Sequence, residues 1–534
     1  MKELFVTVMR NVWQMKDEFF GTGIYLILFL VSVFFFAAME KDKKKQHWFL
    51  GYTGLFAVIY ACPVTAGIIM KYCIGKEVYW RMFWLLPITV MIAYMFTCGI
   101  AQMKGHMKKL LVLLLVVASV AVTAGSHCVY RSGVFEKGSN PYKLNQDILV
   151  VCDAIEADAA SNGIEEKGVI VPAALSAGIR QYDAAIRMPY GRNALRGEKL
   201  SKLAGRIYWN INADRIDAQA LAFYAYEGSY PYLVYRADAD SRAQIEAAGY
   251  TMIADVGNYY IYRLTDDAMQ DSDWLITQYG HADGNQQMFY TMQDHKGHLV
   301  VIDGGWVDGA AEVRTVIETL GNHVDDWLLT HPHDDHIGAF CEIYDAPGSM
   351  KIDHVYAVDM ASPELCLENA SWDGVDMYRR FLSMDISQLE YVHSGDEISV
   401  GDTTIDILSA YEDKIDELSN DLQNDGAMMF RMNGKSETML FCSDVGKHVS
   451  DYLLEKYKDT LKADYLQMGH HGNGGLKADF YEQVHPKVAF FDAPDWLMED
   501  EQGIYTTPAN KKLMEDMGSE VRSFSTAPNS LILR

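Results

Sequence analysis

The sequence predicts a multi-domain protein, with a four-helix transmembrane region at residues 1–126, a small α/β domain at 146–264 and a larger α/β domain at 272–534. Three observations predict this architecture. Apolar runs fill the first quarter of the chain, short apolar segments alternate with turn residues in the remainder, and a dense group of histidines and aspartates follows one of these segments. The length of 534 residues is sufficient for two or three domains.

The charge is distributed unevenly along the chain. Residues 1–125 contain 13 Lys and Arg against 6 Asp and Glu, whereas the remainder contains 33 against 66, so the net charges are +7 and −33. Surfaces that bind nucleic acid use Lys and Arg to displace counterions from phosphates. The acidic body therefore disfavours a nucleic-acid partner. The eight cysteines form no CxxC pair, which indicates neither a disulfide framework nor a Cys-rich metal site.

Four apolar runs predict the membrane region: Ile24–Met39, Phe49–Met70, Met82–Met103 and Leu110–Ala124. About 20 apolar residues cross the hydrocarbon core of a bilayer. Buried core helices are the alternative, but these runs lack the polar face of a globular helix. Several successive runs also argue against a cleaved signal peptide. We expect a multi-pass protein of the cell membrane whose partner is the lipid bilayer.

The lysine-rich connections predict the orientation of these spans. Glu40–Lys45 and Lys104–Lys109 are short and basic, and the positive-inside rule places both in the cytoplasm. Four spans then place the N-terminus and the soluble domains outside the cell. The charge asymmetry is modest. The two lysine-rich connections carry seven basic residues, and the N-terminal tail and the second connection carry six.

A linker rich in Gly, Ser, Lys and Asn, Tyr130–Asn145, leads into the small α/β domain. The predicted elements of this domain are strands at Asp147–Cys152, Gly168–Pro172 and Tyr232–Arg236, a helix at Ser241–Ala248, and a hairpin of Thr251–Ala254 with Tyr259–Arg263. We find no catalytic constellation among these residues.

From Trp274 onward, the pattern is strand, strand, helix, strand. Leu299–Ile302 is a buried strand that ends in Asp303-Gly304-Gly305, Ala310–Leu320 has helical spacing, and the strand Trp327–Leu329 runs into a loop that begins at Thr330.

This loop contains His331, His333, Asp335 and His336. Burying so many polar groups without a partner would cost several kcal/mol each. A divalent metal supplies such a partner, because imidazole and carboxylate are good ligands for zinc and related ions. His331 and His333 project to the same side of a strand end, and the following pair opens a helix beside them. The spacing therefore predicts two adjacent metals.

The motif His331-x-His333-x-Asp335-His336, after a strand that ends in Asp303-Gly304-Gly305, resembles the metallo-β-lactamase superfamily. The resemblance covers about Trp274 to Arg534. It implies an αββα sandwich and metal-dependent hydrolysis. It also implies two divalent ions held at one edge of the paired sheets, with zinc expected and manganese as the alternative.

The same resemblance extends to residues that follow two later strands. Asp444 follows Thr438–Phe441, where the family places a metal-bridging aspartate, and His470 follows Tyr465–Met468, where it places a late histidine ligand. His471 then becomes a group for substrate contact or proton transfer, although the reverse assignment stays open. For one further histidine ligand of the wider family, His354 and His393 are the only candidates, and neither has a recognisable context.

The sequence His470-His471-Gly472 is similar to the ComEC-type branch and related phosphodiesterases, whereas Asn473 and Thr507 depart from that pattern. We therefore predict a membrane-anchored hydrolase of a phosphodiester or similar ester with a small anionic substrate. In this mechanism Asp335 orients the attacking water and accepts its proton, and His471 offsets developing charge. The alternatives are a DNA-processing ComEC-type nuclease domain and a non-catalytic binding protein with a hydrolase-like domain. No protein partner is indicated.

Overall fold

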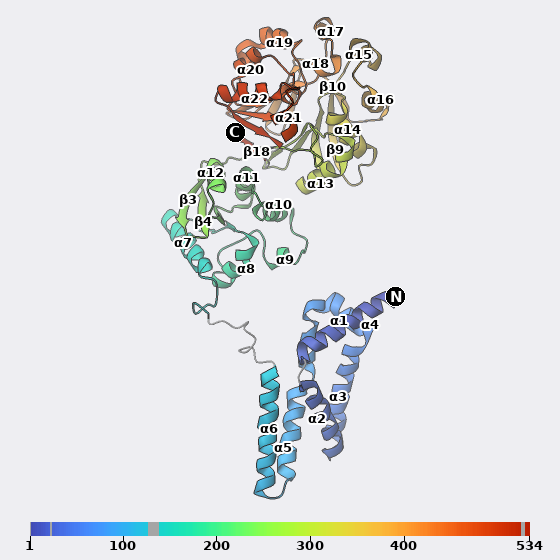
Figure 1. Cartoon of the computed structure of the whole chain (residues 1–534), viewed down its shortest axis with the longest axis vertical. Coiled ribbons are helices and arrows are strands. Elements are labelled where there is room, and N and C mark those ends of the chain that lie inside the picture. Colours follow the sequence, from blue (N-terminus) through green and yellow to red (C-terminus); the bar gives the residue numbers. More distant parts are fainter. Residues whose placement is uncertain (1, 22–23, 127–137, 525–528) are drawn as a thin grey trace. The chain divides into compact units, whose positions relative to one another are not determined.

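The computed structural model of the chain describes residues 2–21, 24–126, 138–524 and 529–534 (Figure 1). It divides into two compact units, Met1–Lys137 and Gly138–Arg534. Residues 130–137 of the predicted linker lie outside the described residues.

The first unit is helical. Its elements are α1 (Lys2–Phe20), α2 (Tyr25–Met39), α3 (Lys43–Ala61), α4 (Pro63–Ile68), the π-helical turn η1 (Ile69–Cys73), the 3₁₀ helix η2 (Lys76–Leu85), α5 (Ile88–Gln102) and α6 (His106–Ser126). Among the described residues, the segment Lys76–Gln102 is long and apolar enough to cross a membrane, and up to three spans result if each of two bent helix pairs is one span. Composition and length thus suggest a membrane location.

Two features of this unit differ from the expectation. The second apolar run is broken, because α3 and the Pro63–Cys73 segment meet at an angle of 66°, and proline cannot donate the hydrogen bond that would continue α3. The first residues of the chain form α1, which was predicted only as a tail.

The fourth run lies in α6, whose side chains are described only up to residue 121.

The second unit begins with a four-stranded sheet of order β1-β2-β4-β3 surrounded by helices. The elements of this middle region are α7 (Gln146–Asn162), β1 (Val169–Ile170), α8 (Ala173–Tyr182), α9 (Arg192–Leu195), α10 (Lys202–Ile211), α11 (Ala218–Gly228), β2 (Tyr232–Arg236), α12 (Ala239–Ala247), β3 (Tyr250–Asp255) and β4 (Tyr259–Leu264). The predicted hairpin of β3 and β4 is confirmed as an antiparallel pair.

The predicted strand at Asp147–Cys152 is wrong, because these residues lie in α7. The side chain of Asn145 caps the helix by accepting a hydrogen bond from the Asp147 amide, and Gly163 ends it in a left-handed conformation. One face of the helix is buried, because Ile148, Val151 and Ile155 pack in a common core. A short apolar run fits a buried helix and a buried strand equally well.

The C-terminal half is an α/β sandwich of two mixed seven-stranded sheets (Figure 1). The first sheet has the order β10 (Leu389–Val392), β9 (Lys351–Val358), β8 (His323–Leu329), β7 (Leu299–Asp303), β6 (Phe289–Asp294), β5 (Trp274–Gln278), β18 (Asn529–Leu533). The second has the order β11 (Glu397–Val400), β12 (Thr403–Ser409), β13 (Met429–Asn433), β14 (Thr438–Phe441), β15 (Tyr465–Gln467), β16 (Val488–Phe491), β17 (Glu520–Ser523).

Helices and helical turns accompany both sheets. They are η4 (Val307–Gly309), α13 (Ala310–Leu320), α14 (Asp334–Asp345), α15 (Pro363–Asn369), α16 (Asp376–Ser383), α17 (Asp413–Leu418), α18 (Leu422–Asp425), α19 (Ser450–Tyr457), η5 (Lys458–Leu461), η6 (Gly469–Gly472), α20 (Ala478–Val484), α21 (Asp495–Glu499) and α22 (Thr507–Asp516). Helices α13 and α14 pack on the first sheet and α22 packs on the second. One apolar core unites both sheets and their helices.

The middle region and the sandwich share apolar and polar contacts. Leu275 of β5 and Ile532 of β18 belong to the apolar core of the middle region. On α10, Arg206 donates hydrogen bonds to the carbonyls of Thr319 (3.2 Å) and Leu320 (2.7 Å), and Lys202 donates to that of Gly321 (2.8 Å). Basic groups at the C-terminal carbonyls of α13 satisfy orphaned acceptors and complement the helix dipole.

We predict that Phe340→Ala destabilises the protein by about 3–5 kcal/mol, because the ring is fully buried on α14 and packs edge-on against Trp327 with centroids 5.0 Å apart. Denaturant titration of the purified protein measures the change. Leu382→Ala is the control, since Leu382 is 48% exposed and we expect a change within about 0.5 kcal/mol. Equal effects of the two substitutions would contradict the packing described here.

Candidate metal centre

The predicted site residues follow the carboxyl ends of strands in both sheets. In the first sheet β7 and β8 are parallel, and in the second β14 and β15 are parallel. The carboxyl ends of parallel neighbours lie at the same edge of a sheet, which is where ligands bind in α/β folds. The loop after β8 carries His331 and His333, the loop after β14 carries Asp444, and η6 after β15 carries His470 and His471.

The backbone at this edge adopts unusual conformations. Asp303, Ser443, His470 and His471 have φ values of 50°, 47°, 51° and 56°. Non-glycine residues seldom adopt this left-handed conformation, and such positions cluster at functional sites because the surrounding structure must hold them there. The site is therefore built on a backbone that the fold constrains.

Asp444 lies at the centre of the site. Its Oδ1 is 3.3 Å from Nε2 of His336. Its Oδ2 is 3.5 Å from Nε2 of His471, 3.8 Å from Nε2 of His470 and 3.9 Å from Nε2 of His331. The structure thus brings histidines from both sheets around one carboxylate, which is buried.

Two overlapping groups of ligand atoms surround this carboxylate. His331, His336 and Asp444 form the first group, and Asp335, His336 and His471 form the second; within each group the ligand atoms lie within 4.8 Å of one another. In the second group, Oδ2 of Asp335 is 3.2 Å from Nε2 of His471. These are two candidate His/Asp metal sites, consistent with a dinuclear centre.

The chemistry of these atoms fits bound divalent cations. Nε2 of His336, Oδ1 of Asp444 and Nε2 of His471 are buried and have no hydrogen-bond partner, and buried polar atoms are rarely left so. In addition, Nε2 of His331 and Nδ1 of His333 face each other at 3.0 Å. Two imidazole nitrogens and a carboxylate that converge in this way form the donor set of a zinc-type site.

A buried carboxylate that the sequence analysis did not assign to the site orients one of these histidines. Asp303, at the end of β7, accepts hydrogen bonds from the Thr330 amide (2.7 Å) and hydroxyl (2.6 Å) and from Nδ1 of His336 (2.7 Å). Since Nδ1 of His336 is occupied, its Nε2 is the atom that faces Asp444. Outer carboxylates of this kind hold metal ligands in position.

Two further acceptors hold the other rings, and they too are absent from the predicted set. Nε2 of His333 contacts Oδ2 of Asp373 at 2.9 Å, which also accepts from Gln423 at 2.6 Å. Nδ1 of His471 contacts the backbone carbonyl of Asp492 at 3.1 Å. Asp373 lies in a loop 40 residues after His333, and no spacing in the sequence indicates this contact.

The carboxylates and imidazoles shift each other's protonation. Burial alone would raise the pKa of Asp335, but the His471 imidazole beside it and the charge of His336 outweigh burial and lower the pKa to about 2. Burial alone would lower the pKa of His471, but Asp444 and Asp335 raise it to about 9. The pKa of His336 is likewise raised by Asp444 and Asp303 against the effect of burial.

The paired histidines of η6 differ in their surroundings. The side chain of His471 is buried between Asp335 and Asp444, whereas that of His470 is 36% exposed and has its only described carboxylate contact, with Asp444, at 3.8 Å. The structure places His354 and His393 outside the site, on exposed positions beside Glu390 and Asp396.

A cavity of about 400 Å³ opens over the site. Its described lining comprises Gln286, His333, Asp335, Trp372, Asp373, Asp421, Asn424, Asp444, His470, His471, Asn473, Trp496, Leu497 and Tyr505. A substrate of small-molecule size therefore has access to Asp335, Asp444 and His470.

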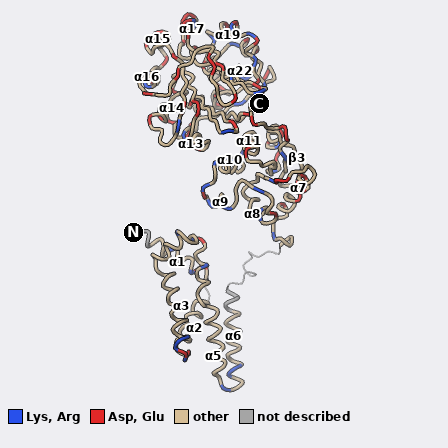
Figure 2. Tube along the Cα trace, turned by 180° about the vertical axis from the view of Figure 1, so that it is seen from behind, with Lys and Arg blue, Asp and Glu red and all other residues tan. Residues whose placement is uncertain are grey.

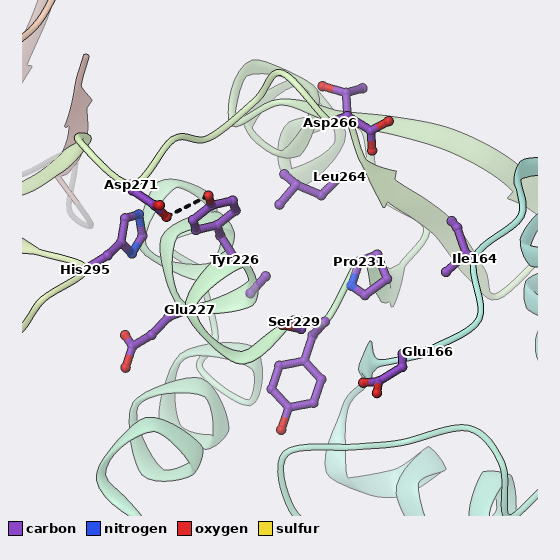
Figure 3. A pocket seen from close by; sticks show the side chains of 13 residues that line it. Ile164, Glu166, Tyr226, Glu227, Ser229, Pro231, Leu264, Asp266, Asp271 and His295 are labelled. Carbon is purple, nitrogen blue, oxygen red and sulfur yellow. Dashed lines mark hydrogen bonds between the residues drawn. The ribbon is translucent and has the colours of Figure 1, made fainter.

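Among the described residues, the other polar clusters do not combine convergence with burial. A larger cavity of about 680 Å³ in the middle region is lined by Glu166, Glu227, Asp266 and Asp271, but Figure 3 shows these carboxylates spread around the cavity, with Asp271 bonded to Tyr226. The group His323, Asp325 and Asp353 is half-exposed or exposed. His323 stands at the start of β8, at the opposite end of that strand from the loop that carries His331.

Comparison with known proteins relates part of the chain to one protein family. The sequence profile described as the metallo-beta-lactamase superfamily matches residues 283–355, which include the loop after β8. The C-terminal half contains a metallo-β-lactamase superfamily domain. With its His/Asp site, this domain is a metallo-hydrolase. No curated protein matches the chain.

Several solved structures are similar to the chain at 14% identity. The metallo-beta-lactamase fold protein YhfI from Bacillus subtilis has a TM-score of 0.32, with 49% of this chain and 100% of that chain covered. A diphosphatase from the PhnP family has a TM-score of 0.30, with coverages of 49% and 97%. CmlA, a diiron beta-hydroxylase from Streptomyces venezuelae, has a TM-score of 0.32, with coverages of 56% and 57%.

We predict that metal binding releases protons. At pH 7.5 the ring of His471, with a pKa of about 9, is protonated in the metal-free protein, whereas a ligand nitrogen must be free of its proton. Zinc affinity should therefore rise by about tenfold per pH unit for each proton released between pH 6.5 and 9. Calorimetry in buffers of different ionisation enthalpy measures the release. Identical heats in every buffer and an affinity independent of pH would contradict this expectation.

Proposed function

We propose that this chain is a membrane-anchored, metal-dependent hydrolase that cleaves a phosphodiester or similar ester. The observation that carries the proposal is the convergence of Asp335, Asp444 and the histidines of two sheets on one cavity, with three buried ligand atoms left without hydrogen-bond partners. The similarity of the His470-His471-Gly472 segment to the ComEC-type branch supports a phosphodiester over other esters.

The ligand set divides the two overlapping groups of ligand atoms between two ions and adds His333, whose Nδ1 lies 3.0 Å from Nε2 of His331. We assign His331, His333 and Asp444 to one ion and Asp335, His336, His471 and Asp444 to the other, with zinc first and manganese as the alternative. Bound there, the ions would activate water at neutral pH and offset negative charge on the attacked group. This assignment makes His471 the ligand, because it is buried beside Asp335, and leaves His470 on the substrate side.

The residues of the chain then have distinct tasks. Asp373 and Asp303 hold the rings of His333 and His336 in position. Asp335, with a pKa of about 2, stays ionised and orients the attacking water by accepting a hydrogen bond from it, and the proton that the water loses passes on to the solvent. His470 lines the cavity with an exposed ring, so it donates the proton that the departing alcohol needs when its bond to phosphorus breaks.

Substitution of the two neighbouring histidines tests this division. His471→Ala should lower the bound metal content and abolish turnover, whereas His470→Gln should keep the metal. With a proton donor removed, His470→Gln should slow cleavage of an alkyl ester by about 10²-fold or more, yet barely affect a nitrophenyl ester, whose leaving group needs no proton. Metal analysis and initial rates on both esters measure these effects.

His393→Ala is the control, because its side chain is 64% exposed outside the cavity. Full metal content in His471→Ala together with lost metal in His470→Gln would reverse the assignment. A metal-loaded parent that hydrolyses no ester would instead favour the non-catalytic binding protein.

We also propose that the first unit anchors the chain with up to four spans and that the soluble part lies outside the cell. Large apolar side chains on its helices are exposed, including Phe34 (75%), Val58 (66%) and Leu111 (57%). Large apolar side chains exposed in such number are suited to contact with lipid. Figure 2 supports the orientation, because the basic connections between α2 and α3 and between α5 and α6 lie at the same end of this unit.

Protease accessibility tests the orientation. In intact cells, added protease should cleave the acidic part of the chain, while the lysine-rich connection between α5 and α6 stays protected until the membrane is opened. A chain that washes off membranes in alkaline carbonate would contradict the anchor, and an acidic part protected in intact cells would reverse the orientation.

A further inference from the structure

The wall of the catalytic cavity is unusual for an enzyme of anionic substrates. None of the described lining residues is Lys or Arg, whereas four of them are aspartates: Asp335, Asp373, Asp421 and Asp444. Phosphate-rich ligands are ordinarily held by Lys and Arg. The metal ions would offset the charge of one ester group, and the described wall offers no Lys or Arg for a second phosphate. A nucleic acid or a nucleoside polyphosphate therefore fits this cavity poorly.

Three large aromatic side chains line the same cavity and are exposed: Trp372 (71%), Trp496 of α21 (48%) and Tyr505 (38%). The indole N–H of Trp496 donates to the Gly284 carbonyl at 2.9 Å, and its ring lies 5.7 Å from that of Tyr505 at an angle of 65°. Exposed apolar side chains that gather at a cavity mark a binding surface. Their faces are electron-rich and attract cations.

The cavity also presents acceptors that lack donors. Asn424 is 8% exposed, and its Nδ2 donates to Oδ2 of Asp421 at 3.0 Å. This hydrogen bond leaves Oδ1 of Asn424 and Oδ1 of Asp421 buried without a partner. Buried acceptors of this kind are expensive unless a ligand supplies the donor. Both residues line the cavity, so the missing donor belongs to a molecule bound there.

We infer that the substrate of this site carries an ammonium group beside the ester that is hydrolysed, held by Asp421, Asn424 and the aromatic residues Trp372, Trp496 and Tyr505. The inference rests on the proposed function, because it names the substrate class of the same site. An ammonium group supplies both the N–H donors for the orphaned acceptors and the positive charge for the carboxylate and the ring faces. A neutral sugar would supply donors for these acceptors but no positive charge for the carboxylate and the ring faces.

Matched nitrophenyl phosphodiesters test this inference with the full-length, zinc-loaded protein. The compounds differ only in the second ester group, which is 2-aminoethyl, 2-hydroxyethyl or 2-carboxyethyl. We expect kcat/KM at pH 7 to be at least about fivefold higher for the amine than for the alcohol, and lowest for the carboxylate. An alcohol hydrolysed as well as the amine would overturn the inference and leave the proposed function intact.

Two substitutions locate the preference. Asp421→Asn and Trp372→Leu should each reduce the amine-to-alcohol ratio of kcat/KM to about twofold or less. Asp376→Asn and Trp209→Leu are the matched controls, because these side chains are fully exposed and 73% exposed and lie outside the cavity. A ratio that neither Asp421→Asn nor Trp372→Leu lowers would also overturn the inference.

Failure of the proposed function gives a different result, namely that no metal restores hydrolysis of any of the three esters. In that case calorimetry decides the inference, with 2-aminoethyl phosphate and 2-hydroxyethyl phosphate as probes of the zinc-loaded protein. Tighter binding of the amine that Asp421→Asn removes would support ammonium recognition, and equal binding of the two probes would overturn it.

Discussion

The buried carboxylate of Asp303 is the contact on which the geometry of the metal centre depends. It joins the end of β7, the first residue of the loop after β8 and the first turn of α14 through three hydrogen bonds. The backbone carbonyl of Asp303 accepts a fourth hydrogen bond, from the indole N–H of Trp327 in the apolar core. A fully buried carboxylate is tolerated only where donors surround it, so the loop has little freedom to rearrange without losing them.

The second sheet holds its half of the site by a similar device. The side-chain oxygen of Gln467, at the end of β15, accepts from the amides of Cys442 (2.8 Å) and Ser443 (2.7 Å). The amide of His470 in turn donates to the Ser443 carbonyl at 2.8 Å. The left-handed residues of both loops are thereby tied to each other, and Asp444 and His471 are held in position before any ligand arrives. Preorganisation of this kind is what electrostatic catalysis requires.

The sequence predicted the elements that carry the site better than the contacts between them. The strands before His331, Asp444 and His470 are confirmed, because each is a short apolar run followed by polar turn residues. Sequence spacing could not distinguish the surroundings of His470 from those of His471, because these depend on two successive residues in the left-handed conformation. The contact of Asp373 with His333 crosses 40 residues of loop and has no periodic signal. Helix α7 was missed because its first half contains an uninterrupted apolar run, Ile148–Cys152, which also fits a buried strand.

The apolar contacts between the middle region and the sandwich restrict how this protein can be cut and recombined. Leu275 and Ile532 sit on strands of the metal-binding half, yet they complete the core of the other half. A shorter fragment that starts near Trp274 would expose both side chains to water. It would also remove the hydrogen bonds that Arg206 and Lys202 donate to the carbonyls at the end of α13. The part of the chain that can be transferred with these contacts intact is therefore the whole unit Gly138–Arg534. A new membrane anchor or tag is best joined before Gly138.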